Sequence, residues 1–101
     1  MDDVDLALHQ VWMEHRDSVL DDLQRLATSI ENWNSGDRSD DIALSIERRA
    51  HRICGSLTIV GRPVDIDELR RLERRATGQR GPYAMEVVER IHDLLDRLRD
   101  S

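Results

Sequence analysis

The sequence predicts an all-α fold, an antiparallel up-and-down four-helix bundle, and three observations support this prediction. Strand-forming aromatic and turn residues are scarce, because the 101 residues include 5 Gly, 2 Pro and no Phe. Apolar residues recur at spacings of three and four in four segments, which is the period of an amphipathic helix. Short runs of turn residues separate these segments. A chain of this length forms one core, so we expect a single domain over residues 1–101.

The first predicted helix runs from Val4 to Trp33. Its apolar positions form one stripe: Val4, Leu8, Val11, Val19, Leu23, Leu26, Ile30 and Trp33. His15 fills the gap in this stripe, so we expect it to be partly buried and hydrogen-bonded. We expect Trp12 and Trp33 to fill the core. The turn sequence Asn-Ser-Gly-Asp at 34–37 ends the helix.

The second predicted helix is capped by Ser39 or Asp40 and ends near Gly61, with Pro63 just beyond. Its core face consists of six apolar residues: Ile42, Ile46, Ala50, Ile53, Leu57 and Val60. A capping box of Asp65 with Glu68 opens the third helix. The inner face of this helix consists of Ile66, Leu69, Leu72 and Ala76.

The fourth predicted helix follows a break at residues 77–81, and Pro82 suits its first position because that position needs no N–H donor. Its apolar stripe consists of Ala84, Val87, Val88, Ile91, Leu94, Leu95 and Leu98. Four helices joined by short loops favour the antiparallel bundle.

Charge and cysteine content narrow the classes of function. The net charge of −6 argues against nucleic acid as the main partner, although arginines gather in the middle of the chain. The single cysteine cannot form an internal disulfide, which suits a reducing compartment. The acidic start and the lack of an apolar stretch of about 18 residues argue against a signal peptide and a membrane span. We therefore expect a cytoplasmic protein with no membrane partner.

The second helix carries the most informative histidine. At about 100° per residue, its core positions fall within roughly 80° of arc, and His51 lies about 150° from their centre. His51 therefore faces water. The same outward surface holds Leu44, Glu47, Arg48, Cys54, Gly55 and Thr58. A glycine inside a helix costs about 1 kcal/mol relative to alanine. Gly55 beside an exposed histidine therefore indicates either a close approach by a partner or a local bend or close packing of the helix.

The sequence around His51 resembles one protein family. Residues 50–57 read Ala-His-Arg-Ile-Cys-Gly-Ser-Leu, Gly61 follows ten residues after the histidine, and Leu72-Glu73 closes the next helical pattern. This combination resembles the histidine-containing phosphotransfer domain. The signature of that family is Ala-His-x-Leu-Lys-Gly-Ser, followed by a glycine at the same distance and by a helix that ends in Leu-Glu. The likeness covers most of the chain.

The resemblance implies a phosphorelay intermediate. His51 would accept a phosphoryl group from the phospho-aspartate of one receiver domain and pass it to an aspartate of another. The expected partners are response-regulator receiver domains and a hybrid histidine kinase. The receiver would supply Mg²⁺, so this chain would need no cofactor or metal of its own and would act as a monomeric carrier without an independent active site.

One residue departs from the family signature, because Cys54 stands where the family usually has lysine. A thiol cannot donate a charged hydrogen bond to phosphohistidine. Arg48 is the best substitute, since it lies one turn before His51, and Arg52 is a second candidate. The alternative for Arg48 is a surface ion pair with Glu47 or Asp41. Cys54 would be a small neutral residue at an exposed docking surface, or else a redox-sensitive thiol.

Two other functions remain open. The chain can be a module that docks on a receiver without being phosphorylated, which the missing lysine favours. It can also be a purely structural helical bundle, such as a dimer. An enzyme with its own active site fits least, because the sequence has no carboxylate pair, nucleophile–base set or phosphate-binding loop.

Overall fold

The computed structural model describes residues 3–59 and 66–100, which form four α-helices and one short 3₁₀ helix. In chain order these are α1 (Asp3–Asn34), α2 (Asp40–Ile59), α3 (Ile66–Arg75), η2 (Ala76–Gly78) and α4 (Met85–Arg99). The described residues contain no strand, so the all-α prediction is confirmed. No helix in this part of the chain is both long enough and apolar enough to cross a membrane.

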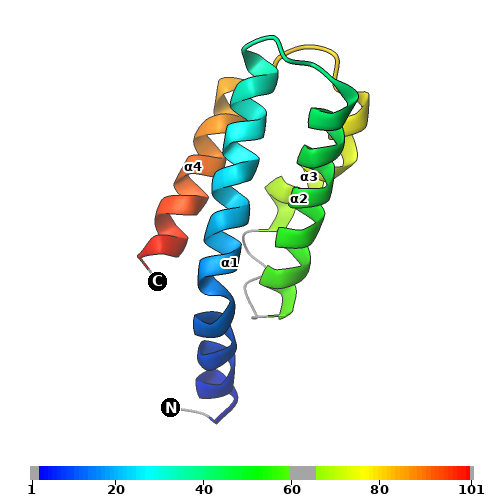
Figure 1. Cartoon of the computed structure of the whole chain (residues 1–101). Helices are drawn as coiled ribbons and strands as arrows, with labels where there is room; N and C mark the ends of the chain where they lie inside the picture. The colour runs from blue at the N-terminus through cyan, green and yellow to red at the C-terminus, as the bar shows by residue number, and fades with distance from the viewer. Residues whose placement is uncertain (1–2, 60–65, 101) are drawn as a thin grey trace.

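The helices lie side by side along the long axis of an elongated molecule that measures 48 × 20 × 19 Å (Figure 1). α1 packs against both α2 and α4, and α3 packs against α2. Polar contacts join α1 to the segment before α4 and to the last residue of α4: the Trp33 indole donates to the carbonyl of Gly81, and Arg16 donates to the carbonyl of Arg99. α1 is therefore the central support to which the other helices attach directly or through α2.

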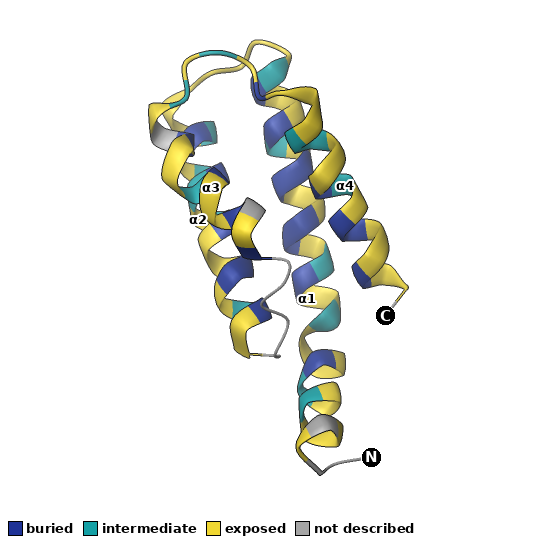
Figure 2. Cartoon of the chain, turned by 180° about the vertical axis from the view of Figure 1, so that it is seen from behind, coloured by how far each residue is buried: buried dark blue, intermediate teal, exposed yellow. Residues whose placement is uncertain are grey.

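The core lies between the helices, where the buried side chains of each face the others (Figure 2). It includes most of the predicted apolar stripes of the four helices, for example Leu23, Ile30, Ile46, Ile53, Leu57, Leu69, Ile91 and Leu98. The prediction for Ala84 was wrong, because this residue precedes the first turn of α4 and is exposed. Full burial of an aliphatic side chain contributes about 1.5–3 kcal/mol relative to exposure. The spacing of apolar residues therefore identifies both the helices and the faces by which they pack.

The turn between α1 and α2 follows the predicted chemistry. Gly36 has a φ of +114°, a region that side chains disfavour. The N–H groups of Gly36 and Asp37 donate to the carbonyls of Trp33 and Asn32, which satisfies the last carbonyls of α1. Ser39 then caps α2, because its hydroxyl accepts from the N–H of Ile42 at 3.3 Å.

α4 begins later than predicted, at Met85 rather than at Pro82. The physical reason is a side chain from α1. The amide of Asn34 accepts from the N–H of Tyr83 at 2.7 Å and donates to its carbonyl at 3.3 Å. These two bonds hold Tyr83 against the end of α1 and delay the helix.

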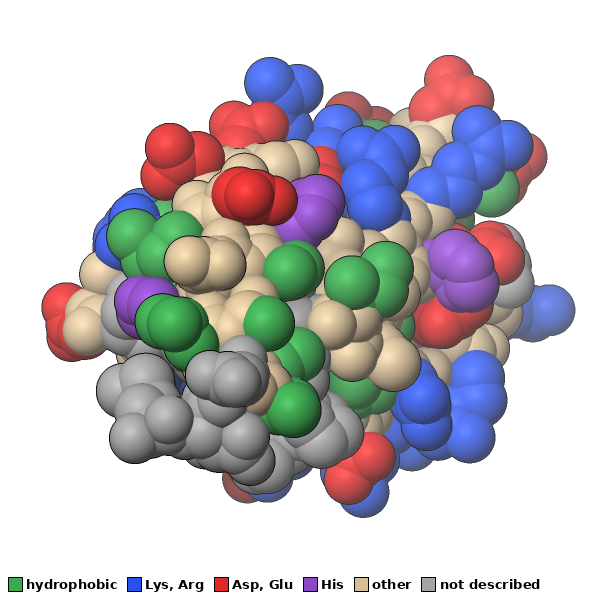
Figure 3. Space-filling view, turned by 90° about the horizontal axis from the view of Figure 1, so that it is seen from below, with side chains coloured by type: hydrophobic (Ala, Val, Ile, Leu, Met, Phe, Trp, Pro, Cys, Tyr) green, Lys and Arg blue, Asp and Glu red, His purple; other side chains and the backbone are tan. Residues whose placement is uncertain are grey.

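The first turns of α1 extend beyond the ends of α2 and α4 (Figure 1). Val4 is consequently 62% exposed rather than part of the core. The prediction for His15 was wrong, because its side chain is exposed, although Trp12 one turn before it is buried. On the helical wheel His15 lies about 60° from Trp12, at the edge of the buried stripe. Hydrophobic side chains gather at this end of the molecule (Figure 3). Those that are exposed include Val4, Leu6, Met13 and Ile59.

Some predictions fall on positions for which no placement is described. Val60, Gly61, Pro63 and Asp65 lie outside the described residues, as does the side chain of Glu68. The end of the second helix and the capping box of the third therefore remain predictions. Ile66, Leu69, Leu72 and Ala76 are all buried, so the inner face predicted for the third helix is confirmed.

Candidate functional site

His51 lies on the outer side of α2, as its position on the helical wheel predicts. Its side chain is 75% exposed. On the opposite side of the helix, Ala50 and Ile53 are fully buried in the core. The packed inner face fixes the position of α2, so the imidazole is presented to solvent from a rigid element rather than from a loop.

Glu73 of α3 orients the imidazole. Its Oε1 lies 2.6 Å from Nδ1 of His51, and the Glu73 side chain is only 30% exposed. A carboxylate can only accept, so Nδ1 carries the proton in this contact. In the neutral ring, Nε2 then holds the lone pair, and no described residue forms a hydrogen bond with it. The site therefore presents one nucleophilic nitrogen to whatever approaches from solvent.

The surface around His51 forms a wide, open depression of about 550 Å³, lined by Glu47, Arg48, His51, Arg52 and Glu73. Gly55 follows His51 by one turn on the same face of α2 and is exposed. A Cβ added to Gly55 would meet no atom within 4 Å, so close packing inside the molecule does not explain this glycine. An open, shallow site of this kind suits contact with a macromolecule better than enclosure of a small substrate.

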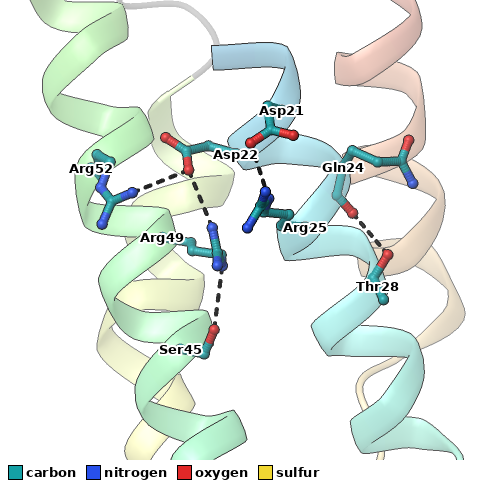
Figure 4. Close-up of polar contacts among 8 residues, drawn as sticks. All are labelled: Asp21, Asp22, Gln24, Arg25, Thr28, Ser45, Arg49 and Arg52. Atoms are coloured by element: carbon teal, nitrogen blue, oxygen red, sulfur yellow. Dashed lines mark hydrogen bonds and ion pairs between the residues drawn. The ribbon is translucent and has the colours of Figure 1, made fainter. Parts of the chain in front are cut away.

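The two arginines that the sequence places near His51 differ in what they bind. Arg52 lies 3.3 Å from the carboxylate of Asp22, and Arg49 lies 3.2 Å from the same oxygen (Figure 4). Arg49 also donates to the hydroxyl of Ser45, which completes a polar cluster between α1 and α2. Arg52 therefore points toward α1, not toward His51. Among the described residues Arg48 forms no ion pair, so its guanidinium is the available positive charge beside the imidazole.

Cys54 corrects the sequence-based prediction, because it is only 7% exposed. α3 packs over this part of α2, and the thiol lies 3.9 Å from the carbonyl of Ile66. Burial, with a smaller contribution from the negative charge of Glu73, raises the pKa of Cys54 to about 11. Cys54 is therefore a neutral, buried thiol that neither docks a partner nor acts as an exposed redox sensor.

The remaining predicted residues surround the depression at different distances. Glu47 is partly buried and contributes to its wall. Leu44 is exposed and lines the adjoining surface with Arg48. Thr58 is exposed, but its hydroxyl donates to the carbonyl of Cys54 at 2.8 Å and is thus occupied within the helix.

The sequence reasoning missed the role of Glu73 as a partner of His51. It used Glu73 only as part of the Leu-Glu pair that closes the third helical pattern. The signal was present, because a carboxylate on a neighbouring helix is a common partner for the second nitrogen of a functional histidine. The register between α2 and α3 was needed to bring the two side chains together.

In the described part of the chain, no three His, Cys, Asp or Glu side chains lie close enough together to hold a metal ion. Comparison of the chain with protein-family models, curated proteins and solved structures finds no match in any of the three. The functional assignment therefore depends on the residues and geometry of the His51 site.

Proposed function

We propose that this chain is a histidine-containing phosphotransfer protein of two-component signalling. His51 carries a phosphoryl group between the aspartates of response-regulator receiver domains. A hybrid histidine kinase is a further partner in this phosphorelay. The phosphotransfer domain comprises residues 1–101, arranged as an antiparallel up-and-down four-helix bundle, and acts as a cytoplasmic monomer. The contacts of Trp33 with Gly81 and of Arg16 with Arg99 support opposite directions for α1 and α4.

The observation that carries this proposal is the arrangement of the two nitrogens of His51. Nδ1 is held by Glu73 at 2.6 Å, and the rest of an exposed ring faces an open depression. Such a contact does little for stability, because a surface pair contributes only about 0–1 kcal/mol even when both partners are charged. Gly55 supports the same interpretation, since it lowers the surface beside the ring at a cost to helix stability.

The chemistry follows from this geometry. Nε2 attacks the phosphorus of the receiver's acyl phosphate, a P–N bond forms, the P–O bond breaks, and the aspartate leaves with the electron pair. The ring keeps its proton on Nδ1 and becomes positively charged as the phosphoryl group arrives. The carboxylate of Glu73 stabilises this charge, and the reverse attack by a second aspartate regenerates the neutral ring. The receiver brings the Mg²⁺ that neutralises the phosphoryl oxygens, and Arg48 contributes a further positive charge.

The test is transfer of phosphate from a phosphorylated receiver to the intact chain. We expect acid-labile, base-stable label on the wild-type protein and none on His51→Gln. His92→Gln is the matched control, because His92 is also a surface histidine in contact with a glutamate, Glu31 at 3.2 Å. Label that persists in His51→Gln, or that disappears equally in His92→Gln, would refute His51 as the acceptor. The transfer is measured against a panel of phosphorylated receivers.

A second function, docking on a receiver without phosphorylation, is favoured by the buried Cys54 at the usual lysine position. It predicts a complex with a receiver that forms equally well in His51→Gln and carries no label. Gly55→Trp distinguishes both docking functions from a purely structural role. A large side chain at this open position would block the approach of a receiver and leave the fold intact.

A further inference from the structure

A second cavity lies on the other side of α3, where α3, the 79–84 connection and α4 meet. Its volume is about 230 Å³, and its walls include Arg71, Arg75, Gln79, Tyr83, Val87 and Arg90. On a helix with about 100° per residue, Arg71 and Arg75 lie roughly 160° from Glu73. The cavity is therefore separate from the His51 site, and an inference about it does not depend on the proposed phosphotransfer function.

The walls of the cavity are strongly basic. Arg71 and Arg75 are one turn apart on α3, and Arg90 faces the cavity from α4. Among the described residues of the lining, the carboxylate is that of Glu86, which is 3.9 Å from Arg90. Counted over these described lining residues alone, three guanidinium groups and one carboxylate give a formal charge of +2. Such a space favours a dianion.

The floor of the cavity is preformed. Asn34 holds the backbone of Tyr83 through two hydrogen bonds, and the amide of Gln79 donates to the carbonyls of Gly81 and Pro82. Burial raises the pKa of Tyr83 to about 12, so its phenol is neutral at physiological pH and adds no negative charge. A rigid floor reduces the ordering cost that a ligand must overcome.

We propose that this cavity binds a small phosphomonoester, with the phosphate held by the arginines and a short apolar group against Leu72 and Val87. Each guanidinium offers five N–H donors in a fork that matches phosphate oxygens. A carboxylate has two oxygens and one negative charge, so it accepts fewer hydrogen bonds from these arginines than a phosphate monoester, which has three terminal oxygens and up to two negative charges. The modest volume limits the ligand to a small molecule, because drug-sized pockets measure about 300–1,000 Å³.

The test is an NMR titration of the ¹⁵N-labelled full chain with phenyl phosphate at constant ionic strength. We expect saturable shifts of the amides of Leu72, Gln79 and Val87. Arg75→Gln and Arg90→Gln should each weaken binding about ten-fold, which is the loss expected for a charge-assisted hydrogen bond. Arg25→Gln is the matched control, because it removes the same charge from α1, outside the cavity lining, and should leave the affinity unchanged.

Two further probes test the ligand class and the location. Inorganic phosphate should bind more weakly than phenyl phosphate, because it lacks the apolar group, and benzoate should bind at least ten-fold more weakly. Benzoate binding as tight as that of phenyl phosphate would overturn the assignment to phosphate. Chemical shifts that do not saturate would show that the cavity is not a binding site. Binding that is lost in Arg48→Ala but kept in Arg75→Gln would place the ligand at the His51 depression instead.

Discussion

The two flanks of α2 use charged residues in different ways. On the flank toward α1, Arg49 and Arg52 share the carboxylate of Asp22, so the positive and negative charges are satisfied inside the molecule. On the flank toward α3, Glu73 holds one nitrogen of His51 and leaves the other facing solvent. The first arrangement joins two helices, whereas the second fixes the orientation of an exposed imidazole and leaves one of its nitrogens open to solvent.

The difference shows that an arginine close to His51 in the sequence is not necessarily available to a ligand of the His51 site. Arg48, Arg49 and Arg52 are all within one turn of His51, yet the two bound by Asp22 contribute to helix packing. Arg48 is the arginine whose guanidinium lines the depression without an ion pair among the described residues. The predictions below test each flank separately.

The largest expected effect concerns the thiol on the flank toward α3. With its pKa raised to about 11, Cys54 has about a hundred-fold less thiolate at pH 8 than a thiol that titrates at 9.0, and burial also blocks access. We expect alkylation by iodoacetamide at pH 8 to be at least a hundred-fold slower in the native protein than in the unfolded protein, as followed by mass spectrometry.

The same thiol gives a pH dependence of stability. Its folded pKa lies above the unfolded value of 9.0, so its contribution is fully present below pH 9 and is lost as the pH rises toward 11. The free energy of unfolding should therefore fall over this range, and less steeply in Cys54→Ala. Rapid alkylation under native conditions would instead place Cys54 at the surface.

The next effect concerns the carboxylate that holds His51. Glu73→Ala removes the partner of Nδ1, so we expect phosphoryl transfer to fall about 10- to 100-fold, the usual range for loss of an orienting partner. Glu73→Gln should be intermediate, because its amide oxygen still accepts from Nδ1 but carries no charge. The ¹⁵N shifts of His51 provide an independent check. They should show protonation mainly at Nδ1 in the wild type and a mixture of tautomers in Glu73→Ala.

On the flank toward α1, we expect a substitution to change the free energy of unfolding rather than phosphoryl transfer. The Asp22 side chain is 10% exposed and is shared by two arginines, so Asp22→Ala leaves both without their partner. We expect a loss of about 2 kcal/mol in the free energy of unfolding by urea. Asp21→Ala is the control, because its pair with Arg25 is exposed and should contribute under about 0.5 kcal/mol. Equal losses in the two variants would contradict a special role for Asp22.

The smallest effect concerns Arg48. We expect Arg48→Ala to slow phosphoryl transfer about five-fold, because it removes one charge from the depression, while circular dichroism shows unchanged helicity. Arg52→Ala removes the same charge from a side chain bound to Asp22 and should change the transfer rate less. Transfer rates equal to the wild type in Arg48→Ala would refute this role.

The helices and their inner faces were predictable from sequence because burial follows the 3.6-residue period, as Ile46, Ile53 and Leu57 illustrate. The start of α4 and the exposure of His15 were not predictable in this way. The start of α4 depends on hydrogen bonds from Asn34, a residue far away in the sequence. The exposure of His15 depends on how far the neighbouring elements cover that side of α1, which the pattern within one helix does not contain.

The candidate site was predictable in part for a related reason. The outward position of His51 follows from the period of its own helix, and the structure confirms it. The burial of Cys54, the contact of Glu73 with His51 and the pairing of Arg52 with Asp22 each depend on the register between two helices. A helical wheel treats one helix alone, so it cannot separate a residue that faces solvent from one that a neighbouring helix covers.

The length of α1 has an optical consequence. Trp12 and Trp33 are both buried in the core and lie twenty-one residues apart on this helix, which separates them by about 30 Å at 1.5 Å per residue. Trp33 contacts the segment before α4, whereas Trp12 lies toward the other end of the core. Variants with a single tryptophan therefore report the opposite ends of the molecule by fluorescence. If the fluorescence of the two variants gives the same unfolding curve, the whole core unfolds cooperatively as one unit.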